Sequence, residues 1–145
     1  MQMRSSAYWL FACLAVVALA GLPTVAAAKD LVICIRQPGD LAVAACSRAI
    51  DSHQYTGRIL LQLYTARGVA HLAHGDLDHA MADFNEAIRL DPKEPRAYFD
   101  RGLVWERKHR LQEALTDFQM HSQLAPSDPD GPKAVERVLK ELSAK

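Results

Sequence analysis

The chain has no excess of charge of either sign, because 17 Lys and Arg residues balance 17 Asp and Glu residues. It therefore lacks the basic footprint that indicates a nucleic-acid partner and the acidic tail that indicates a charged partner. Its longest apolar run, residues 10–22, has about 13 residues. A membrane-spanning helix needs roughly 20. We expect no nucleic-acid partner and, once the N-terminal segment is removed, no membrane association.

Motifs for catalysis are also missing. The sequence contains no Ser/His/Asp arrangement, no Gly-rich phosphate loop and no zinc-protease helix. Two pairs of carboxylates, Asp76 with Asp78 and Asp128 with Asp130, lie in expected turns, where helix capping explains them. We expect a protein that is not an enzyme and that has no cofactor.

The N-terminal residues 1–28 have the pattern of a secretory signal peptide. Arg4 supplies the positive charge, residues 10–22 form the apolar region, and small residues surround a cleavage point after Ala28. The sequence therefore predicts a periplasmic or secreted protein. Two alternatives remain open at this point: an uncleaved membrane anchor, and a lipoprotein that is processed at Cys13.

Cysteine is scarce, and removal of residues 1–28 leaves only Cys34 and Cys46. Two cysteines in an exported chain indicate one disulfide, because the exported compartment permits oxidation. The bridge would enclose the loop 35–45. Closing a loop of this size stabilises a fold by roughly 3 kcal/mol. The alternative is two buried free thiols.

Two stretches of the chain have similar residues at a fixed separation in sequence. For example, Tyr64 in the first stretch corresponds to Tyr98 in the second. A period of this length, about 34 residues, indicates a repeat array. The paired positions are Tyr64 and Tyr98, Arg67 and Arg101, Gly68 and Gly102, His71 and Trp105, Ala80 and Ala114, Asp83 and Asp117, Phe84 and Phe118, Ala87 and His121, Leu90 and Leu124, and Pro92 and Pro126.

These positions resemble the pattern of the tetratricopeptide repeat (TPR) family, in which aromatic residues, Gly, Ala, Phe and Pro recur at fixed places in each repeat. The resemblance implies an all-α fold, a TPR α-solenoid of antiparallel helix pairs with a C-terminal capping helix. The chain resembles in particular the short exported bacterial TPR proteins. The expected divisions are a signal peptide at 1–28, a degraded N-terminal half-repeat at 29–57, TPR repeats at 58–94 and 95–128, and a capping helix at 129–145.

Hydrophobic periodicity and turn residues predict the individual elements. Residues 31–35 are expected to form a short extended or single-turn segment, and Asp40 is expected to cap the first helix. The predicted helices cover residues 40–51, 58–74, 77–90, 95–108, 111–124 and 133–142.

Two positions depart from the family pattern. His121 replaces a small Ala, so we expect a splayed last repeat or a shifted end helix. His109 and Arg110 stand where the first repeat has Gly75 and Asp76. That turn is therefore expected to carry strain or to have a different geometry.

Three histidines, His71, His74 and His79, raise the question of a metal site. His71 replaces a core aromatic of the repeat, and the other two flank an exposed turn. The sequence offers no Cys or carboxylate at a conventional spacing to complete the site. We therefore expect no metal.

The resemblance implies that the first helices of the repeats line a concave groove that takes a peptide or a partner helix. The family's Lys and Asn clamp for a C-terminal carboxylate is absent, since the matching places hold Thr65, Val69 and Asp100. The expected function is that of a scaffold or adaptor for a protein or peptide partner, and the alternative is a homo-oligomer that assembles through residues 29–50 and 133–142. The predicted partner-binding residues are Gln62, Thr65, Val69, Leu72, Ala73, Arg96, Phe99, Leu103, Glu106 and Arg107.

Overall fold

The computed structural model describes residues 22–144, and every regular element in this range is a helix. This confirms the all-α prediction. The helices are α2 (Val25–Arg36), α3 (Asp40–Asp51), α4 (Gly57–His74), α5 (Leu77–Leu90), α6 (Pro95–Arg107), α7 (Leu111–Leu124) and α8 (Asp130–Ser143).

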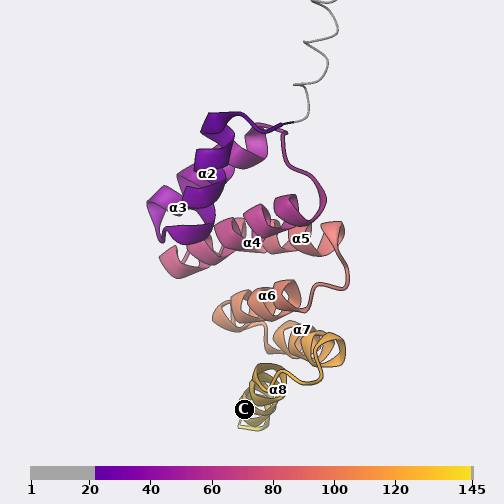
Figure 1. Ribbon diagram of the computed structural model, residues 1–145. Helices are drawn as coiled ribbons and strands as arrows, with labels where there is room; N and C mark the ends of the chain where they lie inside the picture. Colours follow the sequence, from indigo (N-terminus) through magenta and orange to yellow (C-terminus); the bar gives the residue numbers. More distant parts are fainter. Residues whose placement is uncertain (1–21, 145) are drawn as a thin grey trace, which may run out of the picture.

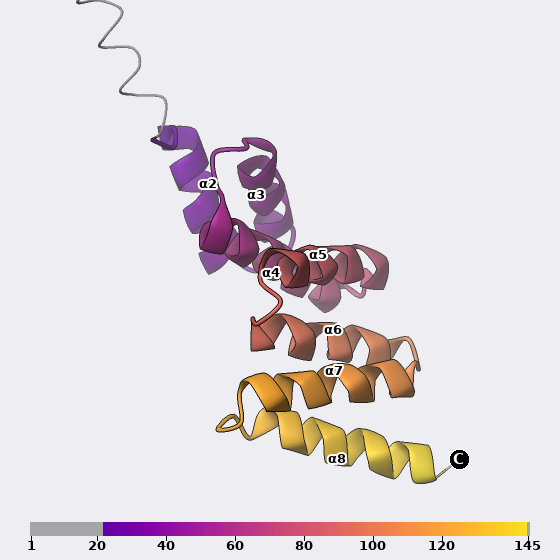
Figure 2. The same cartoon turned by 90° about the vertical axis from the view of Figure 1, so that its right-hand side faces the viewer.

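The helices form antiparallel pairs that stack in chain order (Figure 1, Figure 2). The closest packing is within the pairs α2 with α3, α4 with α5 and α6 with α7, while α8 packs against α7. Each pair then contacts the next, through α3 with α4 and α5 with α6. This nearest-neighbour arrangement confirms the α-solenoid with a C-terminal end helix.

The small residues of the repeat allow the two helices of a pair to approach closely. A Cβ atom added at Gly68 would lie 2.7 Å from the ring of Phe84, and one at Gly102 would lie 2.6 Å from the ring of Phe118. Both rings are completely buried. Glycine is therefore required here for space, and the same contact is built once in each repeat.

The segment before residue 40 differs from the expectation. Residues 31–35 belong to α2, a helix of 12 residues in which Thr24 accepts a hydrogen bond from the N–H of Ala27. The extended or single-turn prediction was wrong, because Leu31, Ile33 and Cys34 pack on α3 and α4 as one face of a helix, while Val32 and Ile35 are exposed on its other side. Asp40 also does not cap α3, since the N-cap residue is Gly39 and Asp40 is the first helical residue.

A disulfide joins Cys34 of α2 to Cys46 of α3, with an S–S distance of 2.07 Å. Both residues are buried in a cluster that includes Ala45, Ala49 and Leu63. The predicted pairing is confirmed, and it holds α2 against the helix that follows.

The two unusual positions of the second repeat are both accommodated. His121 is buried against α8, where a Cβ at Gly131 would lie 2.5 Å from His121 Nδ1. The lack of a side chain at Gly131 therefore makes room for the larger residue. His109 follows Lys108, the C-cap residue of α6, and lies in the left-handed region with φ 58°. Gly75 at the matching place in the first repeat has φ 78°. The expected strain is thus present in the backbone of His109.

The predicted signal peptide falls mostly on residues 1–21, which lie outside the described residues. Its predicted cleavage point after Ala28 lies inside α2, one residue after the buried Ala27. None of the helices in the described part of the chain combines the length and hydrophobicity that a membrane span requires.

Candidate functional site

A groove of about 320 Å³ runs between α2, the N-terminal half of α4 and the start of α6. These are the first helices of successive pairs, so the groove lies on the face that the family resemblance indicated. Its lining residues are Ile35, Arg58, Leu61, Gln62, Thr65, Ala66, Glu94 and Arg96.

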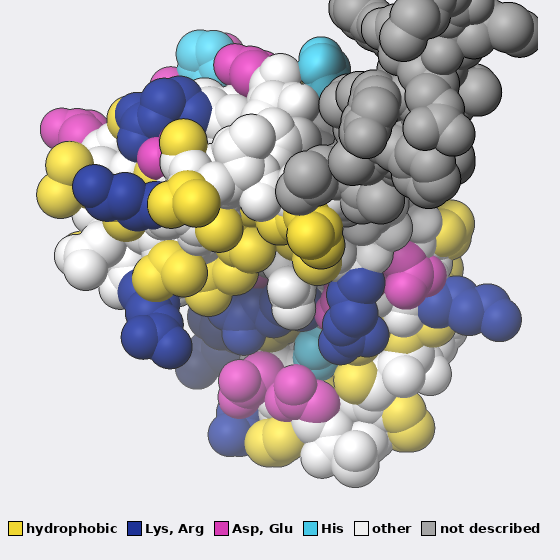
Figure 3. Space-filling model, turned by 45° about the horizontal axis from the view of Figure 1, so that its top comes forward, with side chains coloured by type: hydrophobic (Ala, Val, Ile, Leu, Met, Phe, Trp, Pro, Cys, Tyr) yellow, Lys and Arg dark blue, Asp and Glu magenta, His cyan; other side chains and the backbone are white. Residues whose placement is uncertain are grey.

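The groove has one apolar wall and a charged rim. Ile35 is 52% exposed on α2 and supplies the apolar wall together with Leu61. Figure 3 shows hydrophobic side chains gathered in a patch with Lys and Arg side chains along its border. An extended chain with both apolar and polar side chains suits a surface of this kind.

The charges around the groove are unevenly paired. Arg58 forms no hydrogen bond or ion pair within residues 22–144. Arg96 donates to the buried Asp100, with Nε 3.0 Å from Oδ2, and this bond raises the pKa of Arg96. Burial raises the pKa of the Asp100 carboxyl in spite of that bond. Glu94 accepts a hydrogen bond from the N–H of Arg96.

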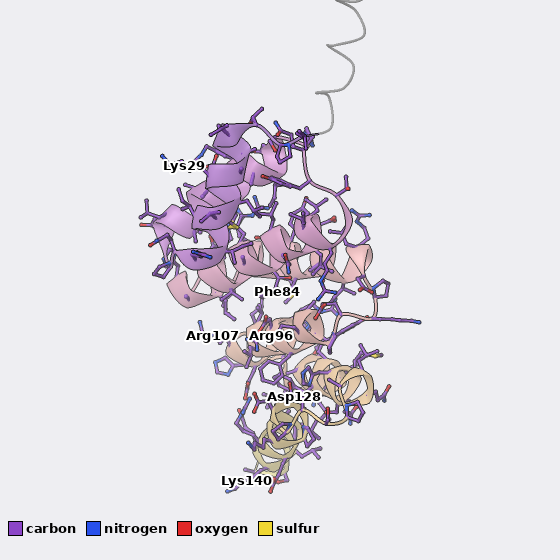
Figure 4. All side chains as sticks on the ribbon, in the orientation of Figure 1. Lys29, Phe84, Arg96, Arg107, Asp128 and Lys140 are labelled. Atoms are coloured by element: carbon purple, nitrogen blue, oxygen red, sulfur yellow. A yellow bond between two sulfur atoms is a disulfide. The ribbon has the colours of Figure 1, made fainter. Side chains whose placement is uncertain are left out.

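Three of the residues expected in the groove line it, namely Gln62, Thr65 and Arg96. Val69 follows on the same face of α4 and is 41% exposed. Figure 4 shows Arg96 and Arg107 on α6, below α4. Within the predicted partner-binding surface, the part that forms an open groove is therefore the part nearer the N-terminal end of the solenoid.

Three apolar residues of the predicted partner-binding site, Leu72, Phe99 and Leu103, are buried or half-buried in the fold. Leu72 is 6% exposed and packs with Phe84 and Val104. The Phe99 ring lies 5.3 Å from the Phe118 ring and is half-buried, as is Leu103. Leu72, Phe99 and Leu103 thus hold helices together and do not line the groove.

Two charged residues of the predicted site are engaged within the protein. Arg137 of α8 donates two hydrogen bonds to Glu106, each 2.8 Å long. Arg107 Nη1 donates to the carbonyl oxygen of Leu72 at 2.5 Å. The end helix and α4 therefore occupy the groups that would otherwise face a partner in the second repeat.

Five lining residues were missed by the sequence analysis. Ile35 was missed because its segment was expected to be extended. Arg58 and Ala66 lie four residues on either side of Gln62, so helical spacing could have found them. The five are Ile35, Arg58, Leu61, Ala66 and Glu94.

A second hollow of about 670 Å³ lies between α7 and α8 at the other end of the solenoid. Its apolar members include Val135 and Leu139, and Leu139 is 48% exposed. The full lining is Gln119, Ser122, Gln123, Pro132, Val135, Glu136 and Leu139.

The histidines of the turn between α4 and α5 have a partner that the sequence analysis overlooked. His79 Nδ1 lies 2.7 Å and His71 Nδ1 lies 3.4 Å from Oδ2 of Asp76. Burial lowers the pKa of His71, and the hydrogen bond from His79 lowers the pKa of Asp76. His74 is turned away toward Asp40, at 3.4 Å.

Comparisons of the sequence and of the structure with known proteins both identify tetratricopeptide repeats. The family described as "Tetratricopeptide repeat" matches residues 63–138. Protein SGT1 homolog of Oryza sativa subsp. japonica is 31% identical over 108 residues, which are 72% of this chain and 28% of that protein. The chain therefore spans little more than a quarter of this relative.

Two solved structures share the arrangement of helices. The Arabidopsis OM64 TPR domain has a TM-score of 0.65 and 27% identity, over 70% of this chain and 81% of that one. The first TPR of Spaghetti (RPAP3), bound to the HSP90 peptide SRMEEVD, has a TM-score of 0.66 and 23% identity. That match covers 72% of this chain and 79% of the other, and at this identity it bears on the fold.

Proposed function

Because the chain belongs to the tetratricopeptide repeat family, we propose that it is a protein-interaction module that binds an extended peptide in the groove between α2, α4 and α6. TPR domains are interaction modules that generally lack enzymatic activity. One observation carries the proposal. The groove combines the exposed Ile35 with Arg58, a cation that has no partner within residues 22–144.

The size of the groove favours an extended peptide over a whole helix. About 320 Å³ is at the lower end of the range for ligand sites. An α-helix is roughly 10 Å across with its side chains and would need a broader hollow. A few side chains of an extended peptide match this volume.

The charges favour a peptide with a carboxylate next to an apolar residue. Arg58 and Arg96 lie on different helices of the groove, and only Arg96 is paired within the described residues. A carboxylate between them would gain charge-assisted hydrogen bonds, which are stronger than neutral ones. The RPAP3 domain is solved with the acidic peptide SRMEEVD, but that match bears on the fold, so the ligand class proposed here rests on Arg58 and Arg96. Because Thr65, Val69 and Asp100 replace the clamp residues, Arg58 would make the contact here.

Selection from a displayed peptide library tests the proposal. We expect enriched peptides to share an apolar residue beside Asp or Glu. In fluorescence anisotropy with one such labelled peptide, Ile35→Asp and Arg58→Glu should each weaken binding at least tenfold. Ile35 is half exposed and Arg58 is exposed, so neither change should unfold the chain.

Leu41→Asp is the matched control, because Leu41 is an exposed leucine on α3 outside the groove. It should leave affinity within twofold. If Ile35→Asp binds as the unchanged chain does, or if Leu41→Asp weakens binding equally, the groove is not the site.

A second candidate function is self-assembly through the ends of the solenoid. The hollow between α7 and α8 exposes Leu139, and the N-terminal helices expose Val32 and Leu41. Exposed apolar side chains at both ends are typical of stacking surfaces. Sedimentation at high protein concentration distinguishes a monomer from an oligomer. If the protein is an oligomer, Leu139→Asp should dissociate it.

We further propose that the protein is exported, to a bacterial periplasm or to the outside of the cell. The disulfide between Cys34 and Cys46 supports an oxidising compartment. The two plant relatives do not bear on this question. Fractionation of the host cell and N-terminal sequencing test both the location and the cleavage after Ala28.

A further inference from the structure

Two imidazoles and one carboxylate converge at the turn between α4 and α5. His71 lies in the last turn of α4, Asp76 is the N-cap of α5, and His79 lies in the first turn of α5. One ligand atom from each of the three lies within 4.8 Å of the other two. The imidazole rings are stacked, with centroids 5.1 Å apart and planes at 23°.

We propose that His71, Asp76 and His79 bind one divalent transition-metal ion of the zinc and copper class. Imidazole nitrogens suit Zn²⁺ and Cu²⁺ better than Ca²⁺ or Mg²⁺, which prefer oxygen ligands. Three protein ligands leave at least one coordination position for water or for an outside ligand.

The two ligand distances to Asp76 require only a small rearrangement. Zn–N and Zn–O bonds of about 2.1 Å place two tetrahedral ligand atoms about 3.4 Å apart. His71 Nδ1 already lies 3.4 Å from Asp76 Oδ2. His79 Nδ1 is nearer, at 2.7 Å, and must move outward from its hydrogen bond. Its side chain is 72% exposed, so a rotation meets little resistance.

The rest of the turn supports a cation at this place. Asp76 Oδ1 accepts the N–H of His79, which leaves Oδ2 directed at the two imidazoles. The C-terminus of α4 favours positive charge and the N-terminus of α5 opposes it, so the two helix dipoles largely cancel. The carboxylate of Asp76 then supplies a negative charge beside the two imidazoles.

The ion would join two helices that pair in the solenoid. A ligand that binds only the folded state stabilises it by mass action. Metal binding would therefore fasten α4 to α5 at the end opposite the peptide groove, since the groove residues of α4 lie between Arg58 and Ala66. The site is thus separate from the proposed peptide contact.

Isothermal titration calorimetry of the full chain with ZnCl₂ tests the inference. We expect one saturable site per chain. His79→Gln removes an exposed ligand, and Asp76→Asn keeps a good N-cap residue while removing the charge. Each variant should bind Zn²⁺ at least tenfold more weakly. His74→Gln is the matched control, because His74 points to Asp40, and it should bind within twofold of the unchanged chain.

Long-range ¹H–¹⁵N spectra of the imidazoles provide a readout that a purely structural role would not move. On addition of Zn²⁺, the ring nitrogens of His71 and His79 should shift, and those of His53 and His109 should not. The absence of a saturable heat, or unchanged affinity in His79→Gln and Asp76→Asn, would overturn the proposal.

Discussion

Arg67 and Asp83 are joined by two parallel hydrogen bonds, Nε to Oδ2 at 2.9 Å and Nη2 to Oδ1 at 2.7 Å. The carboxylate is buried and the guanidinium is mostly buried. The same pair recurs in the next repeat as Arg101 and Asp117, with both distances 2.8 Å. A two-point bond of this kind fixes both the distance and the rotation between the helices of a pair.

Each of these arginines also reaches back to the preceding pair of helices. Arg67 Nη1 donates to Ser47 of α3 at 3.0 Å, and Arg101 Nη1 donates to Asn85 of α5 at 2.8 Å. One side chain therefore joins three helices. The shared spacing of Arg and Asp in the two copies thus has a structural reason within this molecule.

Replacing Asp83 with Ala should lower the free energy of unfolding by about 3 kcal/mol, because Arg67 would be left without its partner in a mostly buried place. Asp117→Ala should have a similar effect. Urea denaturation measures both. The double variant Arg67→Met with Asp83→Leu should recover much of the loss, and equal losses in the single and double variants would contradict the pairing.

Gly131→Ala should destabilise the chain by about 1–3 kcal/mol, because the new methyl group would overlap the His121 ring and the Ser122 hydroxyl. Alanine is otherwise the better helix former. Thermal unfolding of the chain is the measurement. In the background of His121→Ala the same change should cost less or should stabilise, and an additive result would mean that the two residues do not oppose one another.

His109→Gly should stabilise the chain by about 1 kcal/mol, because His109 has φ 58° where glycine has no steric cost. The turn keeps the same hydrogen bonds as the turn at Gly75, with His109 N–H donating to the Glu106 carbonyl and Arg110 N–H to Trp105. Denaturant unfolding measures the change. Gly75→Ala is the reciprocal control and should lose stability.

The stability of the chain should depend on pH through Asp100. Burial raises the pKa of its carboxyl, so the folded chain holds that proton more tightly than the unfolded chain. The resulting stabilisation is full below the unfolded pKa, about 4, and is lost as pH rises through the folded pKa. Arg96, which donates a hydrogen bond to this carboxyl, and the imidazole of His121 are the basic side chains that act on it.

Asp100→Asn removes this dependence while an amide oxygen can still accept from Arg96. Compared with the unchanged chain, the variant should therefore be relatively more stable at pH 7 than at pH 3.5. Urea titrations at the two pH values measure the difference. A difference of the opposite sign would show that the ion pair with Arg96 outweighs the burial of the carboxylate.

The helices from α4 to α7 could be predicted closely because they carry two copies of one pattern. The ends of α5 and α7 coincide with the expected residues 77–90 and 111–124. The repeat pattern does not extend to α2, which precedes the first recognisable repeat and contains the β-branched residues Val32, Ile33 and Ile35. Its helical state comes from packing on α3 and from the bridge at Cys34, which are tertiary effects.

The candidate site was only partly predictable for a related reason. Position in the repeat identifies the groove face, and Gln62, Thr65 and Arg96 lie there. It does not reveal that α8 engages Glu106 through Arg137. Sequence spacing also could not predict that Asp76 lies beside His71 and His79, because the conformation of the turn between α4 and α5 determines their distance.

The backward contact from Arg101 to Asn85 has an evolutionary consequence. A further copy of residues 61–94 placed ahead of residue 95 would present to its neighbours the same serine-or-asparagine acceptor, the same arginine and the same aspartate. Such a chain could lengthen by duplication of a repeat, because the contacts between neighbouring helix pairs would stay the same. The number of repeats in such a chain could therefore change during evolution by one pair of helices at a time.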